Sequence, residues 1–160
     1  MQERRLTVPR SARYFTLGRP EREVWFVLHG YGQLAARFLP HFESLDDGTR
    51  LIVAPEGLSR FYLTESPTER RVGASWMTRD DRLTEIEDYV RYLDAVYTDV
   101  FESLDAARVK VTVLGFSQGA ATACRWTTLG AARGDRLIVW GGEVPPDVDL
   151  SAIDPVQEAR

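Results

Sequence analysis

The sequence predicts an α/β fold, with a mostly parallel sheet and helices on both of its faces. Four short runs of apolar, largely β-branched residues are spread along the chain: Val24–Leu28, Leu51–Ala54, Val111–Leu114 and Leu137–Trp140. Uninterrupted apolar runs of this length are typical of strands that are buried on both faces, as in a parallel sheet. Helical patterns lie between these runs, and the alternation of strand and helix favours parallel pairing.

Three segments have helical patterns. The clearest is Asp81–Leu104, where apolar residues recur every three or four positions and form one stripe. We expect Asp80 to be its N-cap, with Asp81 in the first turn, where a negative charge suits the helix dipole. A shorter helix is expected over Leu34–Leu45, and a third, rich in small residues and closed by Gly130, over Gln118–Leu129.

The remaining segments predict edges and loops. Arg5–Val8 and Tyr14–Leu17 alternate in hydropathy around Pro9, which predicts antiparallel N-terminal edge strands. Glu56–Thr78 reads as a long irregular loop, and loops of that length are often functional. We expect a single α/β domain over residues 1–160, in which the proline-rich residues 146–160 form a loose C-terminal segment.

Composition excludes several classes of protein. The chain of 160 residues has 20 Lys and Arg against 24 Asp and Glu, a formal net charge of −4, which argues against nucleic acid as a partner. Cys124 is the single cysteine, so there is no internal disulfide. Neither an apolar run of about 18 residues nor a signal peptide is visible, so we expect a soluble, cytoplasmic protein with no membrane span.

The strongest chemical signal is Gly115-Phe116-Ser117-Gln118-Gly119, a G-x-S-x-G motif. It lies between an expected buried strand and an expected helix, the setting of a nucleophile elbow. A Cβ at either glycine would clash with the neighbouring strand or helix, and the serine is forced into a strained conformation. We therefore predict that Ser117 is a nucleophile at the carboxyl end of the sheet.

A second signal, His29-Gly30-Tyr31-Gly32-Gln33, directly follows the first apolar run. In an acyl-transfer reaction, the backbone N–H of Tyr31 would join that of Gln118 in an oxyanion hole. We interpret His29 as a structural histidine that holds this loop, because it lies beside the hole and not across from Ser117. The same loop also matches a dinucleotide-binding pattern, Gly30-x-Gly32-x-x-Ala35, followed by Glu56 at the end of the next strand.

Together these segments resemble the α/β-hydrolases of the phospholipase/carboxylesterase type, which include the acyl-protein thioesterases. The matching segments span about residues 22–146: Leu28–Gly32, Ala54–Gly57, Ser75-Trp76, Gly115–Ala120 and the strand Leu137–Trp140 with Gly141, Gly142 and Pro145 after it. The resemblance implies a serine esterase or thioesterase that cleaves acyl esters through an acyl-enzyme on Ser117. It also implies that Tyr31 and Gln118 donate to the oxyanion, and that His29, Gly30, Gly32, Ser75, Trp76 and Met77 line the substrate site.

A base for Ser117 is the missing part. In this fold the acid and the histidine follow the serine in the chain, but His29 and His41 are the two histidines and both precede it. Asp147, Asp149 and Asp154 come too early to match the family's acid. To explain the missing base, we favour the interpretation that this chain lacks the C-terminal part of a longer esterase. A catalytically silent binding module, or recruitment of His41, are the alternatives.

The sequence says little about the substrate, metal ions or other protein chains that the protein would bind. Phe61, Tyr62, Trp76 and Met77 are candidates for an apolar acyl pocket, and the arginines at 60, 70, 71 and 79 for an acidic leaving group, although a solvated loop face explains them as well. Two histidines and one cysteine do not make a metal site, and no cofactor is expected. An uncovered sheet edge after Leu137–Trp140 would favour a homo-oligomer.

Overall fold

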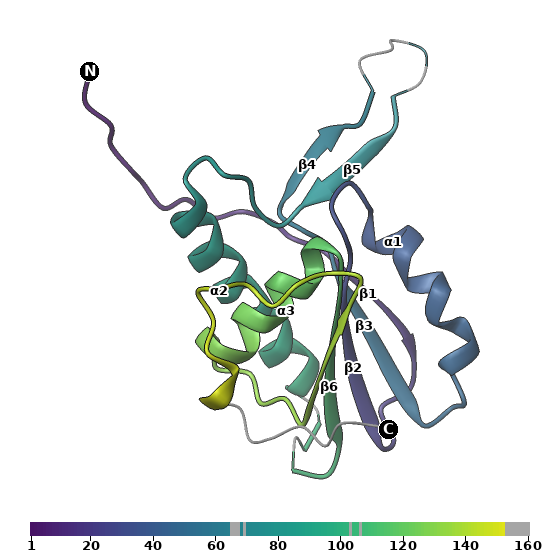
Figure 1. Ribbon diagram of the computed structural model, residues 1–160. Helices are drawn as coiled ribbons and strands as arrows, with labels where there is room; N and C mark the ends of the chain where they lie inside the picture. The colour runs from purple at the N-terminus through teal and green to yellow at the C-terminus, as the bar shows by residue number, and fades with distance from the viewer. Residues whose placement is uncertain (65–67, 69, 103, 106, 153–160) are drawn as a thin grey trace.

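The computed structural model describes residues 1–64, 68, 70–102, 104–105 and 107–152. A five-stranded sheet, in the order β1-β3-β2-β6-β7, forms its centre (Figure 1). The strands are β1 (Tyr14–Gly18), β2 (Glu23–Leu28), β3 (Arg50–Pro55), β6 (Lys110–Phe116) and β7 (Arg136–Trp140). Pairing is parallel between β3, β2, β6 and β7 and antiparallel only between β1 and β3, which confirms the predicted mostly parallel α/β sheet.

Helices cover both faces of this sheet (Figure 1). The helices α2 (Arg82–Phe101) and α3 (Gln118–Leu129) pack on one face, and the short α1 (Ala35–Phe38) with the 3-10 helix η1 (Leu39–Leu45) packs on the other. Because alternate residues of a strand point to opposite faces, Phe26 packs with Trp126 of α3 while its neighbour Val27 packs on the α1 side. The sheet thus has two buried apolar faces, as its uninterrupted apolar strands predicted.

The prediction of a strand over Arg5–Val8 is wrong, and β1 alone forms the antiparallel edge. Leu6 and Val8 expose 87% and 64% of their surface. A strand there would bury too little apolar area to offset the entropy of ordering it.

The segment expected to be an irregular loop contains a hairpin instead. Strands β4 (Ser59–Tyr62) and β5 (Val72–Ser75) pair antiparallel and project from the body of the molecule (Figure 1). A Cβ on Gly73 would overlap the backbone of Gly32, so this glycine lets the hairpin lie against the loop that follows β2. The hairpin is therefore packed at its base against the loop that follows β2.

The helix α2 starts later than its sequence suggested. Asp81, at φ +50°, and not Asp80, precedes its first residue, and Leu83 in the first turn is 69% exposed. Its buried stripe begins at Ile86 and runs to Val100. Within the described part of the chain, no helix has both the length and the apolarity needed to cross a bilayer.

Candidate active site

Ser117 stands in a sharp turn between β6 and α3, at the carboxyl end of the sheet. Its backbone has φ +53° and ψ −116°, a conformation that costs a residue with a side chain about 1–3 kcal/mol. Its N–H donates to the carbonyl oxygen of Trp140 at 2.9 Å, so the last strand of the sheet holds the turn. Strain that is retained between a buried strand and a helix is the hallmark of a nucleophile elbow.

The two glycines of the motif permit this turn. A Cβ on Gly115 would overlap the backbone of Gly119, and a Cβ on Gly119 would overlap the carbonyl groups of Leu28 and His29. The expected clash with the neighbouring helix and strand is therefore confirmed at both positions. Because Gly119 touches the end of β2, α3 starts directly beside the loop that follows β2.

That loop lies against Ser117. A Cβ on Gly30 would sit 3.1 Å from Cβ of Ser117. Gly32, at φ +75°, donates its N–H to the carbonyl oxygen of Ala74 in β5 at 2.8 Å, and the N–H of Gly30 donates to Oε1 of Gln33 at 2.7 Å. Within the described residues, the backbone N–H groups of Tyr31 and Gln118 donate to no protein acceptor. Neither group is therefore committed to an acceptor within these residues.

His29 is fully buried, and both of its ring nitrogens are occupied. Nε2 accepts from the N–H of Gly57 at 2.9 Å, so Nδ1 carries the proton and donates to the carbonyl oxygen of Gly30 at 2.8 Å. Burial lowers the pKa of this imidazole below its usual value. A neutral histidine with two internal partners stabilises the loop and has no nitrogen to offer Ser117.

Ser75, Trp76 and Met77 follow β5 and reach the start of α3. Trp76 is only 2% exposed, so it does not line an open pocket; its indole packs on the His29 ring at 5.0 Å and on Tyr89. Ser75 is also buried, whereas Met77 is partly exposed. All three residues bond to the side chain of Gln118, the first residue of α3.

Sequence reasoning missed the role of the Gln118 side chain. Its Nε2 donates to the carbonyl oxygen of Met77 at 2.8 Å and to Oγ of Ser75 at 3.1 Å, and its Oε1 accepts from the N–H of Trp76 at 3.0 Å. A glutamine in a G-x-S-x-G motif gives no hint of its partners, because these lie about 40 positions earlier in the chain.

A second missed feature is a buried arginine. Arg125 in α3 is 4% exposed and pairs through two nitrogens with Asp147, which also binds Arg82 at 2.8 Å. The sequence did carry a signal for this pair, because an arginine within a helix of small and apolar residues needs a carboxylate partner when it is buried. Asp147 is thus committed to α3; Asp154 lies outside the described residues.

Other candidates lie elsewhere. Glu56 is 2% exposed and accepts from Arg13 at 2.8 Å and from the N–H of Ala35 at 3.3 Å, so it presents no free carboxylate for a ribose and the dinucleotide interpretation loses its support. His41 is exposed in η1, on the opposite face of the sheet from α3. Cys124 is buried in α3, as expected of a small core residue.

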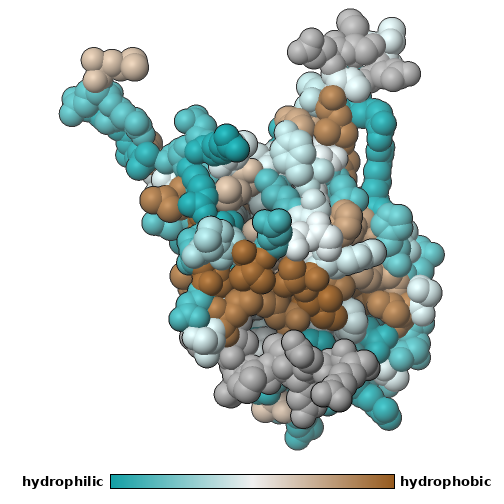
Figure 2. Space-filling model, in the orientation of Figure 1, coloured by the Kyte–Doolittle hydropathy of each residue, from teal (hydrophilic) through white to brown (hydrophobic). Residues whose placement is uncertain are grey.

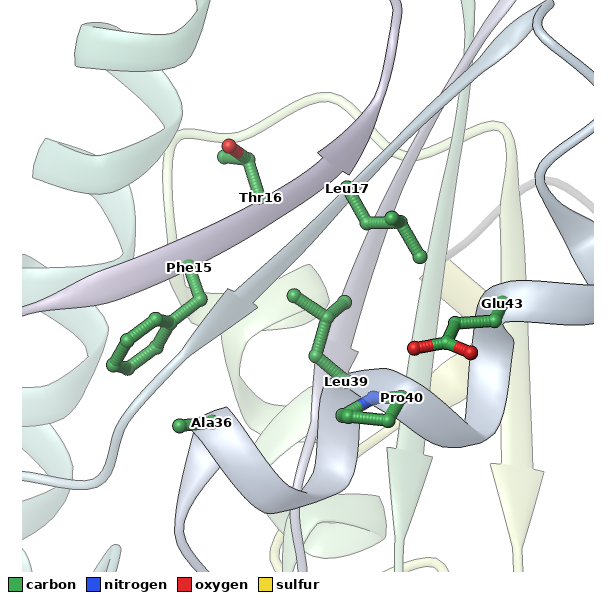
Figure 3. Close-up of a pocket in the computed structure, with 7 residues that line it drawn as sticks. All are labelled: Phe15, Thr16, Leu17, Ala36, Leu39, Pro40 and Glu43. Atoms are coloured by element: carbon green, nitrogen blue, oxygen red, sulfur yellow. The ribbon is translucent and has the colours of Figure 1, made fainter.

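A hollow of about 200 Å³ lies between β1 and the α1–η1 segment (Figure 3). Phe15, Leu17 and Leu39 line it together with the carboxylate of Glu43. These residues belong to the opposite sheet face from α3, so the hollow is separate from the Ser117 site.

The sheet order, the strained serine between β6 and α3, and the glycine loop after β2 define the α/β-hydrolase fold. Solved structures agree. The chain matches esterase PE8 (TM-score 0.58, 23% identity) over 82% of its own length and 64% of the esterase. It matches a carboxylesterase from Mesorhizobium loti (0.56, 23%) over 76% and 56%, and acyl-protein thioesterase 2 from Zea mays (0.52, 23%) over 74% and 52%.

The chain therefore spans less than two thirds of the length of these structures. No model of a known protein family matches the sequence, and no curated protein is significantly similar to it. The comparisons accordingly establish the fold, while the chemistry rests on the site.

Proposed function

We propose that Ser117 is the nucleophile of a hydrolase of the carboxylesterase or thioesterase type, which cleaves acyl esters through an acyl-enzyme. The observation that carries this proposal is the strained backbone of Ser117 in the turn between β6 and α3, with Gly30 so near that a Cβ on it would lie 3.1 Å from Cβ of Ser117. Proteins retain such strain mainly where function requires it.

The oxyanion hole is formed by the N–H groups of Tyr31 and Gln118. Each donor aimed at a tetrahedral intermediate lowers the barrier by about 3 kcal/mol. The exposed ring of Tyr31 packs on Phe61 of the hairpin at 5.1 Å, which offers apolar surface for an acyl group beside the serine. The Tyr31–Phe61 pair, and not the buried Trp76, is therefore the apolar surface that we assign to the acyl group.

The general base is the part that these residues do not supply. His29 is internally bonded and His41 is on the other sheet face. Because triad members act as a unit, the 160-residue chain should turn over esters about 10⁴–10⁶ times more slowly than a complete triad. A histidine from outside these residues, or a small base from solution, would restore the rate.

Imidazole in solution tests this proposal. We expect the 160-residue chain to hydrolyse p-nitrophenyl acetate slowly. Imidazole should increase this rate by more than the hydrolysis that imidazole causes without protein, and S117A should lose the additional increase. The exposed serine variant S151A is the matched control and should behave like the parent. If S117A and the parent respond equally to imidazole, the serine is not a nucleophile.

The same equality would favour a catalytically silent binding module on this fold. The observation in favour of that alternative is that neither histidine can act as a base for Ser117, because both ring nitrogens of His29 are bonded and His41 lies on the other sheet face. The imidazole experiment therefore decides between the two.

A further inference from the structure

We propose that Trp76 is a positioning residue that fixes the two oxyanion donors relative to each other. The donors belong to separate elements, since Tyr31 follows β2 and Gln118 begins α3. Trp76 belongs to neither element and donates a hydrogen bond to each of them. This inference rests on the proposed function of Ser117 and adds to it the device that holds its oxyanion hole.

On one side, Trp76 is attached to the start of α3. Its backbone N–H donates to Oε1 of Gln118 at 3.0 Å, and the carbonyl oxygen of the next residue, Met77, accepts from Nε2 of the same amide at 2.8 Å. The hydroxyl of Ser75 donates to Met77 as well, at 2.9 Å. These bonds hold the Gln118 side chain in one orientation. They therefore also fix the first residue of α3, and with it the backbone N–H of Gln118, relative to Trp76.

On the other side, Trp76 is attached to the loop that carries Tyr31. Its indole Nε1 donates to the carbonyl oxygen of His29 at 2.8 Å, and the two rings are 5.0 Å apart at 31°. Ala74, two residues earlier, accepts from the N–H of Gly32 and donates to Gln33. The loop is thus bonded on both sides of Tyr31 to the segment that contains Trp76.

This connection matters because the donors are backbone groups, whose positions only their surroundings can set. A donor must lie about 2.7–3.1 Å from the developing oxyanion, so small displacements remove its effect. Trp76 is 2% exposed, so water does not compete for either of its bonds. It acts on the site through Gln118 and His29 and does not itself touch the reacting atoms.

A thiol at position 117 provides a readout that needs no general base. In S117C, the backbone N–H groups and the start of α3 should stabilise the thiolate and lower the pKa of the thiol below its usual value of about 8.5. The pH dependence of its alkylation by iodoacetamide then measures how well the donors are placed. Cys124, the chain's own cysteine, is buried and contributes little background.

The decisive comparison is between two buried tryptophans in the S117C background. W76F removes the indole N–H that binds His29, and W126F removes the one that binds Asp94 at 2.8 Å. Trp126 is fully buried in α3 and is not bonded to the donor loop, so it is a matched control. We expect W76F to slow alkylation near neutral pH by about three- to tenfold through a raised thiol pKa, and W126F to lower the melting temperature without that shift.

Q118M is the second variant, because it keeps the backbone N–H and loses the side-chain bonds to Trp76 and Met77. It should slow alkylation in the same direction as W76F. If S117C reacts readily but W76F and Q118M match W126F, Trp76 has no positioning role while the proposed function stands. If S117C itself has an ordinary thiol pKa, the oxyanion hole is absent and the proposed function fails with it.

Discussion

Arg125 and Asp147 form a two-bond ion pair, with Nε to Oδ2 and Nη2 to Oδ1 both at 2.9 Å. The pair ties the segment after β7 to α3, two turns beyond Ser117. Between these two residues, Gly142 packs against the carbonyl group of Ser117, where a Cβ would come within 2.5 Å of the oxygen. The chain that leaves β7 is therefore held close against the elbow.

Removing the charge of Asp147 should destabilise the protein. Loss of one partner of a buried pair costs about 3–5 kcal/mol, and the partial exposure of Asp147 reduces this to about 2 kcal/mol for D147N. We expect the melting temperature to fall by about 4–8 °C in calorimetry. D88N breaks the exposed Asp88–Arg91 pair and should change it by less than about 2 °C; equal effects would mean that burial of Arg125 adds nothing.

The same pair makes stability depend on acid. The Arg125 guanidinium holds the pKa of the Asp147 carboxyl well below its usual range, so its contribution is present above the unfolded pKa of about 3.9 and is lost as the pH falls toward the folded pKa. Urea unfolding of the parent between about pH 5 and pH 3 should therefore show a steeper loss of free energy than unfolding of D147N. Parallel curves would contradict this assignment.

His29 should remain neutral in the folded protein at a pH where an exposed histidine is charged. Burial lowers its pKa, so the unfolded chain binds the proton more readily and folding stability falls as the pH drops below about 6.5. In ¹⁵N NMR, the His29 ring should keep its Nδ1–H tautomer at about pH 6. A titration midpoint at or above 6.5 would show that the ring is not held as described.

The G-x-S-x-G glycines should tolerate no side chain. A Cβ at Gly119 would overlap backbone atoms that cannot move aside, so G119A should cost about 3 kcal/mol or more in urea unfolding. Gly134 is the matched control, because its Cβ would meet only methyl groups at 3.7 Å and beyond. G134A should therefore stay within about 0.5 kcal/mol of the parent. A mild G119A variant would contradict the close contact between α3 and β2.

Among the described residues, β7 is the outer strand of the sheet with no strand paired beyond it, and Trp140 at its end is 55% exposed. Figure 2 shows hydrophobic surface gathered over β7 and the segment that follows it. Open apolar edges promote pairing with another chain, so we expect concentration-dependent self-association in sedimentation velocity. W140K, which places a charge at the exposed end of this strand, should abolish it, while L129K, at an exposed leucine at the end of α3, should not. A parent that stays monomeric would rule the edge out as an interface.

The sequence predicted those parts of the structure whose signal is local. The strands β2, β3, β6 and β7 are runs of apolar residues that only a buried sheet accommodates, and the G-x-S-x-G turn is specified by its own glycines. The hairpin was missed because β4 and β5 are four residues each, too short to show a period. The Trp76–Gln118 bond was missed because it joins a backbone N–H to a side-chain amide 42 positions away, and neither group gives a sequence pattern.

The resemblance of Ser75-Trp76 to a substrate-lining segment shows the same limit. Whether a tryptophan lines a pocket or fills a core depends on what surrounds it, and here its indole is enclosed by His29 and Tyr89. No property of the two-residue motif distinguishes these outcomes.

The most direct test of the account is the site of covalent labelling by a fluorophosphonate, located by peptide mass spectrometry. We expect a single adduct on Ser117, formed slowly by the chain alone, faster with added imidazole, and absent in S117A. An adduct spread over several serines, or no adduct on Ser117 even with imidazole, would contradict the claim that this residue is an oriented nucleophile beside an oxyanion hole.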